Sequence, residues 1–147
     1  MLRNILLALS LLALTLAACS QAAPTVAEEV DFAAVCDTAN KGQRVAVQGY
    51  LRLPDSFTGD LSVVLRLYET ADLSGTPIGV QIRLGTKANQ VEQVPAEYND
   101  EDLKVHLSNG QVVEFGTKVK VSGKVYYPQV DQDFECGLEN PLLETAN

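Results

Sequence analysis

Two stretches of the chain, residues 42–54 and 116–128, share one pattern of alternating apolar and polar positions. In the later stretch the two alternating sets are Val119, Val121, Gly123, Val125 and Tyr127, and Lys118, Lys120, Ser122, Lys124 and Tyr126. Such a period of two residues predicts a β-strand with one buried and one wet side. Each stretch has a mid-strand glycine, Gly49 or Gly123, which usually marks a tight bend at a barrel corner. We therefore predict an all-β fold, a small barrel of five to seven strands.

Two further strands are expected between these stretches. Residues 61–70 and 78–84 alternate in the same way and are predicted to pair as an antiparallel hairpin. The predicted inward positions of the first three strands are Val45, Val47, Gly49, Leu51, Leu53, Leu61, Val63, Leu65, Leu67, Ile78, Val80, Ile82 and Leu84. Residues 85–102 lose this periodicity and are expected to be a connecting segment.

The second half of the chain predicts another hairpin and a closing strand. Residues 103–107 and 111–115 flank Asn109-Gly110, and Asn-Gly is the strongest short hairpin signal. Residues 134–138 are expected to form a last short strand. After it, Leu142 and Leu143 are expected to fold back on the core, and the final residues to be loose. Near the other end, residues 28–40 place apolar side chains at helical spacing and predict a short amphipathic helix that covers one end of the barrel.

The N-terminus has the composition of an export signal. Arg3 precedes an apolar run from Ile5 to Ala18, which is too short to span a membrane comfortably. Residues 16–19, Leu-Ala-Ala-Cys, resemble a bacterial lipobox, in which Cys19 receives diacylglycerol and becomes the mature N-terminus. The expected organisation is a lipoprotein signal peptide at 1–18, lipidated Cys19 with a flexible tether at 19–29, and one domain at 30–147. The alternative is an ordinary signal peptide that has a cysteine near its cleavage site.

Export changes how the cysteines are interpreted. With Cys19 lipidated, Cys36 and Cys136 remain as an even pair in an oxidising compartment, one before the first glycine-bent strand and one after the second. They are expected to form a disulfide; two buried free thiols are the alternative. The chain is therefore expected to be exported and anchored to the cell membrane or outer membrane by the lipid on Cys19.

The charge of the chain limits its partners. The net charge is −8 for the whole sequence, and −9 once Arg3 is removed with the signal peptide. Nucleic acid is an unlikely partner for so acidic a domain, because neutralisation of phosphates supplies most of the affinity of nucleic-acid-binding proteins.

The order of strands and loops resembles the OB-fold, a small Greek-key barrel. At the level of residues the chain is similar to bacterial OB-fold domains of the anticodon-binding-like group. The matching positions are Asn40, Lys41, Gly42, Val45, Val47, Gly49, Gly116, Val119, Val121, Gly123, Val125, Cys136 and Leu138. The resemblance covers residues 32–138 and implies that the two glycine-bent strands lie side by side. It implies little about function, since this fold hosts many.

In OB-folds the ligand face is usually the outer side of the second and third strands and the adjoining loops. The residues that fall there are Phe57, Arg66, Tyr68, Gln81, Arg83 and Tyr126. Arginine beside tyrosine suits an anionic or planar ligand. The alternative is that outward Lys and Arg only prevent strands from pairing edge to edge with other molecules.

A metal site and a catalytic site have weaker support in the sequence than a ligand face. Asp131, Asp133 and Glu135 lack the spacing of a calcium loop, and His106 has no nucleophile or orienting partner in any recognisable motif. No metal site, cofactor or enzymatic activity is expected. The expected function is a binding or assembly module of the cell envelope that recognises a protein or an anionic glycan or lipid. The alternatives are an extracytoplasmic nucleic-acid-binding protein and a purely structural lipoprotein.

Overall fold

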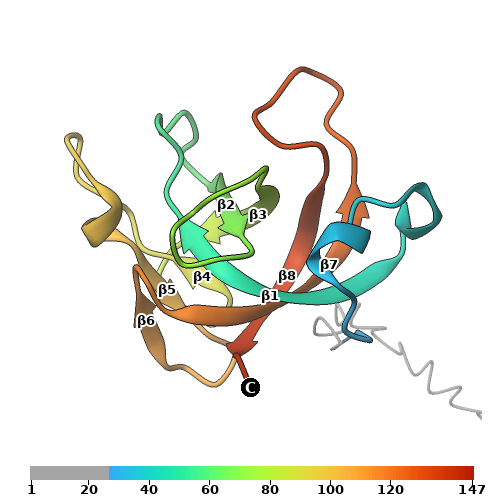
Figure 1. The fold of residues 1–147 in the computed structure, drawn as a ribbon. Coiled ribbons are helices and arrows are strands. Elements are labelled where there is room, and N and C mark those ends of the chain that lie inside the picture. Colours follow the sequence, from blue (N-terminus) through green and yellow to red (C-terminus); the bar gives the residue numbers. More distant parts are fainter. Residues whose placement is uncertain (1–26) are drawn as a thin grey trace, which may run out of the picture.

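A computed structural model describes residues 27–147 (Figure 1); the predicted signal peptide, Cys19 and most of the tether lie outside the described residues. The strands are β1 (Arg44–Arg52), β2 (Ser62–Tyr68), β3 (Ile78–Leu84), β4 (Gln90–Val91), β5 (Lys104–His106), β6 (Val112–Glu114), β7 (Lys118–Tyr126) and β8 (Gly137–Thr145). Three 3₁₀ turns are η1 (Phe32–Ala34), η2 (Thr38–Asn40) and η3 (Asp100–Asp102). The predicted all-β class is confirmed.

Five of these strands close into a barrel. Neighbouring strands follow the order β2-β1-β7-β8-β3, and a further pairing between β2 and β3 completes the ring. Only the β3–β8 pairing within the ring is parallel, so the barrel is mixed. The strands β4, β5 and β6 extend from β3 as a short ribbon, in which β5 and β6 form the hairpin predicted around Asn109-Gly110. This arrangement is consistent with an OB-fold-like domain.

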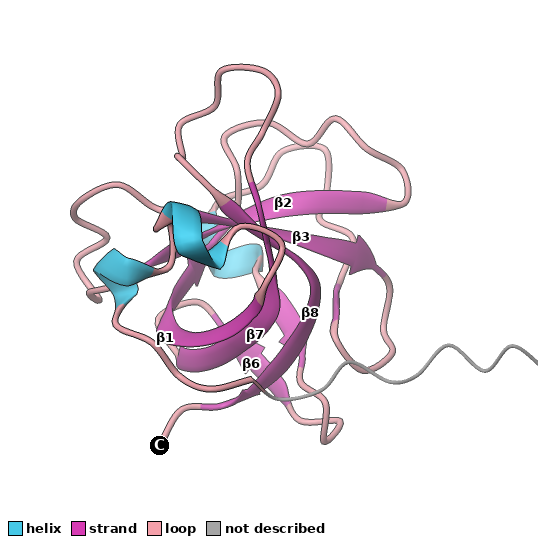
Figure 2. Ribbon diagram, turned by 90° about the vertical axis from the view of Figure 1, so that its right-hand side faces the viewer, coloured by secondary structure: helices cyan, strands magenta, loops and turns pink. Residues whose placement is uncertain are grey.

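The two glycine-bent strands are neighbours, as expected. In the antiparallel β1–β7 pair, Gly49 lies opposite Val119 and Gly123 opposite Val45. A Cβ atom on Gly49 would stand 2.4 Å from the backbone oxygen of Tyr68, and one on Gly123 would stand 2.7 Å from the Cβ of Leu138. Both glycines therefore allow close approach of a neighbouring strand. Figure 2 shows β1, β7 and β8 curving side by side around the barrel.

Most predicted inward residues form the core. Leu65, Leu67 and Val80 are fully buried, together with Val121 and Leu143 from the closing strands. Leu61 is a wrong prediction, because it lies just before β2 and its side chain is 78% exposed. Ala46, expected to face outward, is buried because residues 28–30 run beside it: Val30 N donates to Ala46 O and Ala46 N donates to Glu28 O.

The predicted N-terminal helix is wrong, and the closing strand is longer than predicted. Residues 28–40 form the bridge to Ala46 followed by two separate 3₁₀ turns, and extended Asp37 interrupts helical geometry between the turns. At the other end, the closing strand β8 runs to Thr145, beyond the predicted residues 134–138, and pairs with β7. Leu143 is buried on it, as expected of a residue that folds back on the core.

The predicted disulfide is present. Cys36 and Cys136 are joined, with their Cα atoms 5.5 Å apart. Tyr127 also donates its hydroxyl hydrogen to the backbone oxygen of Cys36 at 2.5 Å. Cys36 therefore holds both ends of the loop between β7 and β8, at Tyr127 and at Cys136. Because disulfides persist in oxidising compartments, this bond indicates an extracytoplasmic location.

Candidate functional site

Three loops lie together at one end of the barrel and form the candidate site. They are residues 53–61 between β1 and β2, 92–103 between β4 and β5, and 127–136 between β7 and β8; we call them the loop end. Figure 1 shows them at the top, opposite the C-terminus and the point where the described chain begins. The tips of these loops therefore lie on the side of the domain away from its first described residues.

Two of the grooves in the loop end lie on either side of loop 53–61. A groove of about 780 Å³ lies between it and loop 92–103, with Arg52, Pro54 and Tyr98 in its lining. A second groove, of about 550 Å³, has residues of loop 53–61 on one wall and Gln132 and Asp133 of loop 127–136 on the other. Cavities of this size, open to solvent, can accept side chains or a short segment of a partner.

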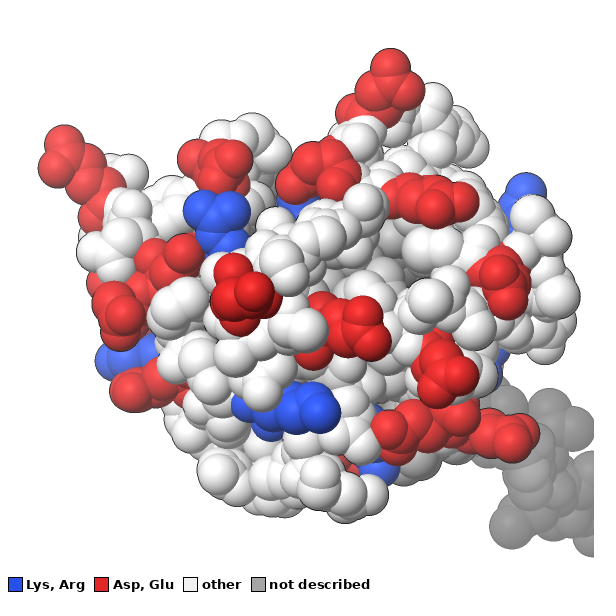
Figure 3. Space-filling view, in the orientation of Figure 1, with Lys and Arg blue, Asp and Glu red and all other residues white. Residues whose placement is uncertain are grey.

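The loop end holds nearly all the excess negative charge of the domain. Its ten acidic residues are Asp55, Asp60, Glu92, Glu97, Asp100, Glu101, Asp102, Asp131, Asp133 and Glu135, and none of its residues is Lys or Arg. Counting the adjoining Arg52 and Arg66 with it gives a net charge of −8. The rest of residues 27–147 has nine acidic and eight basic residues, a net charge of −1. Figure 3 shows acidic side chains at the tips of the projecting loops.

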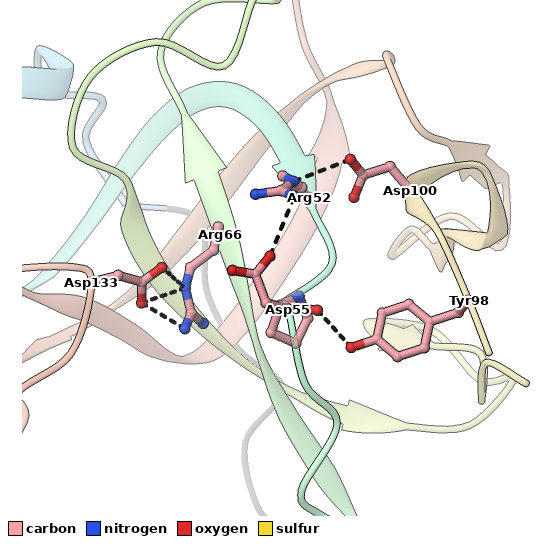
Figure 4. Close-up of polar contacts among 7 residues, drawn as sticks. Arg52, Asp55, Arg66, Tyr98, Asp100 and Asp133 are labelled. Atoms are coloured by element: carbon pink, nitrogen blue, oxygen red, sulfur yellow. Dashed lines mark hydrogen bonds and ion pairs between the residues drawn. The ribbon is translucent and has the colours of Figure 1, made fainter. Parts of the chain in front are cut away.

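Arg52, at the end of β1, joins the two loops of the larger groove. Its Nε lies 3.1 Å from Asp100 Oδ2 and its Nη2 lies 3.3 Å from Asp55 Oδ1 (Figure 4). The hydrogen bond to Asp100 raises the pKa of the Arg52 guanidinium. Asp100 is positioned by η3, whose N-cap residue Asn99 accepts a hydrogen bond from Glu101 N. The guanidinium is therefore satisfied by carboxylates from both loops.

An aromatic pair adds to the contact between loops 53–61 and 92–103. Tyr98 donates its hydroxyl hydrogen to Pro54 O at 2.7 Å, and its ring meets Phe57 edge to face at 5.5 Å between centroids. Burial raises the pKa of the Tyr98 hydroxyl, and the nearby carboxylates of Asp55 and Asp100 raise it further. Tyr98 therefore stays neutral at physiological pH and keeps its donor role.

Arg66, on β2, holds loop 127–136 in a similar way. Its Nε lies 2.8 Å from both carboxylate oxygens of Asp133, and its Nη2 lies 2.6 Å from Asp133 Oδ1 (Figure 4). The guanidinium also lies 4.9 Å from the ring centroid of Phe134, a cation–π contact. Both partners come from the loop, so Arg66 is engaged within the molecule.

Phe134 occupies a space that glycine provides. In the strand pairings Arg66 lies opposite Gly79, and Gly79 lies opposite Gly137 on β8. A Cβ on Gly79 would stand 2.7 Å from the Phe134 ring, and one on Gly137 would stand 2.5 Å from the ring of Tyr126. The two aromatic rings therefore cover adjacent glycines on the outer face of β3 and β8.

The Arg66–Asp133 pair predicts a pH-dependent effect. Hydrogen bonds from Arg66 hold the pKa of Asp133 below its usual value. A lowered pKa in the folded state stabilises the protein above the unfolded-state pKa, and this contribution disappears as the pH falls through the folded-state pKa. Asp133→Asn should therefore lower the free energy of unfolding at pH 7 by about 1 kcal/mol or less, because Asp133 is more than half exposed.

Urea unfolding at pH 7 and at pH 2.5 measures this difference. The cost of Asp133→Asn should be smaller at the lower pH, because pH 2.5 lies below the unfolded-state pKa of an aspartate and part of the stabilisation by the pair is lost there. Asp131→Asn in the same loop is the control, and should change the free energy of unfolding by no more than about 0.5 kcal/mol at pH 7. A cost of Asp133→Asn that is equal at both pH values would contradict the assignment.

The structure places the predicted ligand residues in two groups. Arg66, Gln81 and Arg83 share the outer face of β2 and β3, where Val64 lies opposite Gln81 and Ser62 opposite Arg83. Gln81 and Arg83 are exposed, and Arg83 makes no ion pair within residues 27–147. Tyr68 lies on the same strand as Arg66 but is only 9% exposed.

The other two aromatic candidates have structural contacts. Phe57 packs against Tyr98 in the loop end. Tyr126 is half-buried over Gly137, and burial raises the pKa of its hydroxyl. Sequence reasoning missed the partners Asp55, Asp100, Asp133 and Phe134. The glycines of β3 and β8 were the available signal for Phe134, since a glycine within a strand often marks a close approach.

Outside these grooves, His106 Nε2 lies 2.9 Å from Glu92 Oε1. Among residues 27–147, no three His, Cys, Asp or Glu side chains are grouped closely enough to hold a metal ion. No helix in that part of the chain is long and apolar enough to cross a bilayer. A scan against protein-family models and searches of curated proteins and of solved structures found no match.

Proposed function

We propose that the protein is a lipid-anchored binding module of the cell envelope, without catalytic activity, that recognises another protein through its loop end. The observation that carries the proposal is the position of the two grooves and the excess negative charge. Both lie at the end of the barrel opposite the start of the described chain. A module tethered there would present its grooves away from the membrane.

The length of the N-terminal segment supports a lipid anchor close to the domain. Cys19 and Ala27 are eight residue steps apart, and at about 3.5 Å per step this segment reaches at most about 28 Å. A lipid on Cys19 would hold the domain near the bilayer while leaving it free to turn. The acidic loop end would be repelled by anionic lipid headgroups, which favours the same orientation.

Charge supports a protein partner over an anionic glycan, lipid or nucleic acid. Arg52 and Arg66, the arginines beside the grooves, are already paired with carboxylates of the loops. An anionic ligand would have to displace Asp133 to reach Arg66, and it would approach a surface of net charge −8. Like charges in such proximity disfavour association.

Photocrosslinking in living bacteria tests the proposal. A photoreactive amino acid replaces Thr58, which lies in the lining of the smaller groove, or Ser108, an exposed residue of the turn between β5 and β6. We expect the chain with the probe at Thr58 to form a discrete crosslink to another protein, and the chain with the probe at Ser108 to form none of the same mass. Equal capture from both positions, or none from Thr58, would argue against a binding role for the loop end.

Two accompanying measurements test the anchor. Labelled palmitate should be incorporated into the wild-type chain, and Cys19→Ala should abolish the incorporation. Incorporation that persists in Cys19→Ala would show that Cys19 is not the lipidated residue.

A further inference from the structure

The two cysteines of the disulfide differ in their access to solvent. Cys36 is half-buried and lies in the lining of a pocket of about 160 Å³. Cys136 is fully buried and does not line that pocket. A reagent from outside therefore meets the bond at Cys36. The other residues of this lining, which we call the Cys36 pocket, are Phe32, Ala33, Thr76, Pro77, Ile78 and Glu135.

The backbone around the two cysteines reinforces this difference. The backbone oxygen of Cys136 accepts a hydrogen bond from Gly79 N at 3.0 Å, which holds Cys136 against β3. Cys36 lies between the 3₁₀ turns η1 and η2, outside the sheet. In thiol–disulfide exchange a thiolate attacks one sulfur of the disulfide, and the rate depends on which sulfur it can reach. The sulfur within reach is that of Cys36, so Cys136 is the leaving group.

We propose that Cys36 is the site at which a partner protein carrying a dithiol breaks and makes this disulfide. In the reductive direction, a thiolate of the partner attacks Cys36 Sγ, the bond to Cys136 breaks, and Cys136 leaves as a thiolate that takes up a proton. The second thiol of the partner loses its proton, attacks the partner's own sulfur in the mixed disulfide and releases Cys36 as a thiolate. The partner is thereby oxidised to a disulfide, and two electrons pass to the cysteine pair.

Formation of the bond follows the same route in reverse. The Cys36 thiolate attacks the disulfide of the oxidised partner, and the Cys136 thiolate then attacks Cys36 Sγ and releases the partner as a dithiol. This direction suits the oxidising location that the disulfide indicates. The inference is independent of the proposed role of the loop end. Among residues 27–147, the Cys36 pocket shares no lining residue with either of the two grooves described above.

A small thiol shows which cysteine forms the mixed disulfide. The full chain in nonionic detergent is treated briefly with cysteamine and quenched with excess N-ethylmaleimide. Digestion after glutamate then places Cys19, Cys36 and Cys136 on separate peptides, because glutamates lie between them. We expect cysteamine on Cys36 and N-ethylmaleimide on Cys136. Cysteamine on Cys136, or in equal amounts on the two, would overturn the proposal.

Filling the pocket tests the route of access. Ala33→Trp adds a large side chain to the lining and should slow the opening of the disulfide by cysteamine about threefold or more, since the rate depends on access to the sulfur. The matched control is Ala39→Trp, an exposed position of η2 outside the lining, which should leave the rate unchanged. If Ala33→Trp fails to fold, Thr76→Trp fills the same pocket from the chain before β3. Equal rates in wild type and the folded pocket variant would contradict the assignment.

A dithiol protein separates attack on the folded chain from attack after unfolding. The probe is a thioredoxin whose second active-site cysteine is replaced by serine, so that the mixed disulfide persists. We expect a covalent complex through Cys36, formed at a rate proportional to the thioredoxin concentration and lowered by Ala33→Trp. A rate that stops rising with concentration at the rate of global unfolding would mean that the bond is reached only in the unfolded chain, and the proposal would fail.

Discussion

Replacing both disulfide cysteines, as Cys36→Ser with Cys136→Ser, should lower the free energy of unfolding by about 2–5 kcal/mol. The bond closes a loop across a sequence separation of 100 residues. In the chain-entropy account, a loop of this length stabilises the folded state by about 4.7 kcal/mol, because it restricts the unfolded chain. Cys136 is also fully buried, so serine would place a hydroxyl in the core.

Urea denaturation of the oxidised, reduced and doubly substituted chains measures this effect. Reduced wild-type protein should unfold at a lower urea concentration than the oxidised protein, and the double variant should be unaffected by reductant. Because Cys36 holds both ends of loop 127–136, we also expect the crosslink from Thr58 to form in lower yield in the double variant. Oxidised and reduced chains of equal stability would contradict the assignment.

Phe134→Ala should lower the free energy of unfolding by about 3–5 kcal/mol. The side chain is 5% exposed, stacks on the Arg66 guanidinium and covers Gly79. Its removal leaves a cavity over Gly79 of β3 and removes the contact of loop 127–136 with the Arg66 guanidinium. Val130→Ala in the same loop is the control, and should change the free energy of unfolding by about 0.5 kcal/mol or less, because Val130 is exposed.

A double-mutant cycle identifies the contact responsible. Gly79→Ala alone should cost about 1–3 kcal/mol, since the added Cβ would stand 2.7 Å from the Phe134 ring. In the Phe134→Ala background the same substitution should cost less, with an interaction free energy of about 0.5–3 kcal/mol. Costs that simply add would mean that Phe134 does not lie against Gly79.

The barrel could be predicted from the sequence because its signals are local. Alternation identified the strands, and Asn109-Gly110 identified a hairpin. The mid-strand glycines Gly49 and Gly123 predicted bends of a barrel, and the structure shows that each also allows a neighbouring strand to approach closely. The helix predicted over residues 28–40 failed because apolar spacing over so short a stretch competes with tertiary contacts. There the backbone of Val30 bonds to Ala46 instead.

The candidate site was harder to predict because its contacts are non-local. Arg66 was identified as an outward residue, but its partner Asp133 lies 67 positions away, and Asp100 lies 48 positions from Arg52. No periodicity connects residues at such separations. Each loop has an acidic composition of its own, and only the barrel topology brings the three loops to one end. The sequence therefore predicted a ligand face on the second and third strands, and the gathering of acidic loops at one end of the barrel was missed.

The proposed role of the protein is to bind a partner through its loop end. The yield of the crosslink from Thr58 in living cells tests this role when it is compared among three chains: wild type, Arg83→Ala, and Gln132→Trp, which places a bulky side chain in the lining of the smaller groove. We predict that Arg83→Ala leaves the yield unchanged and that Gln132→Trp lowers it severalfold at equal protein levels. A yield that falls with Arg83→Ala and persists in Gln132→Trp would contradict binding through the loop end.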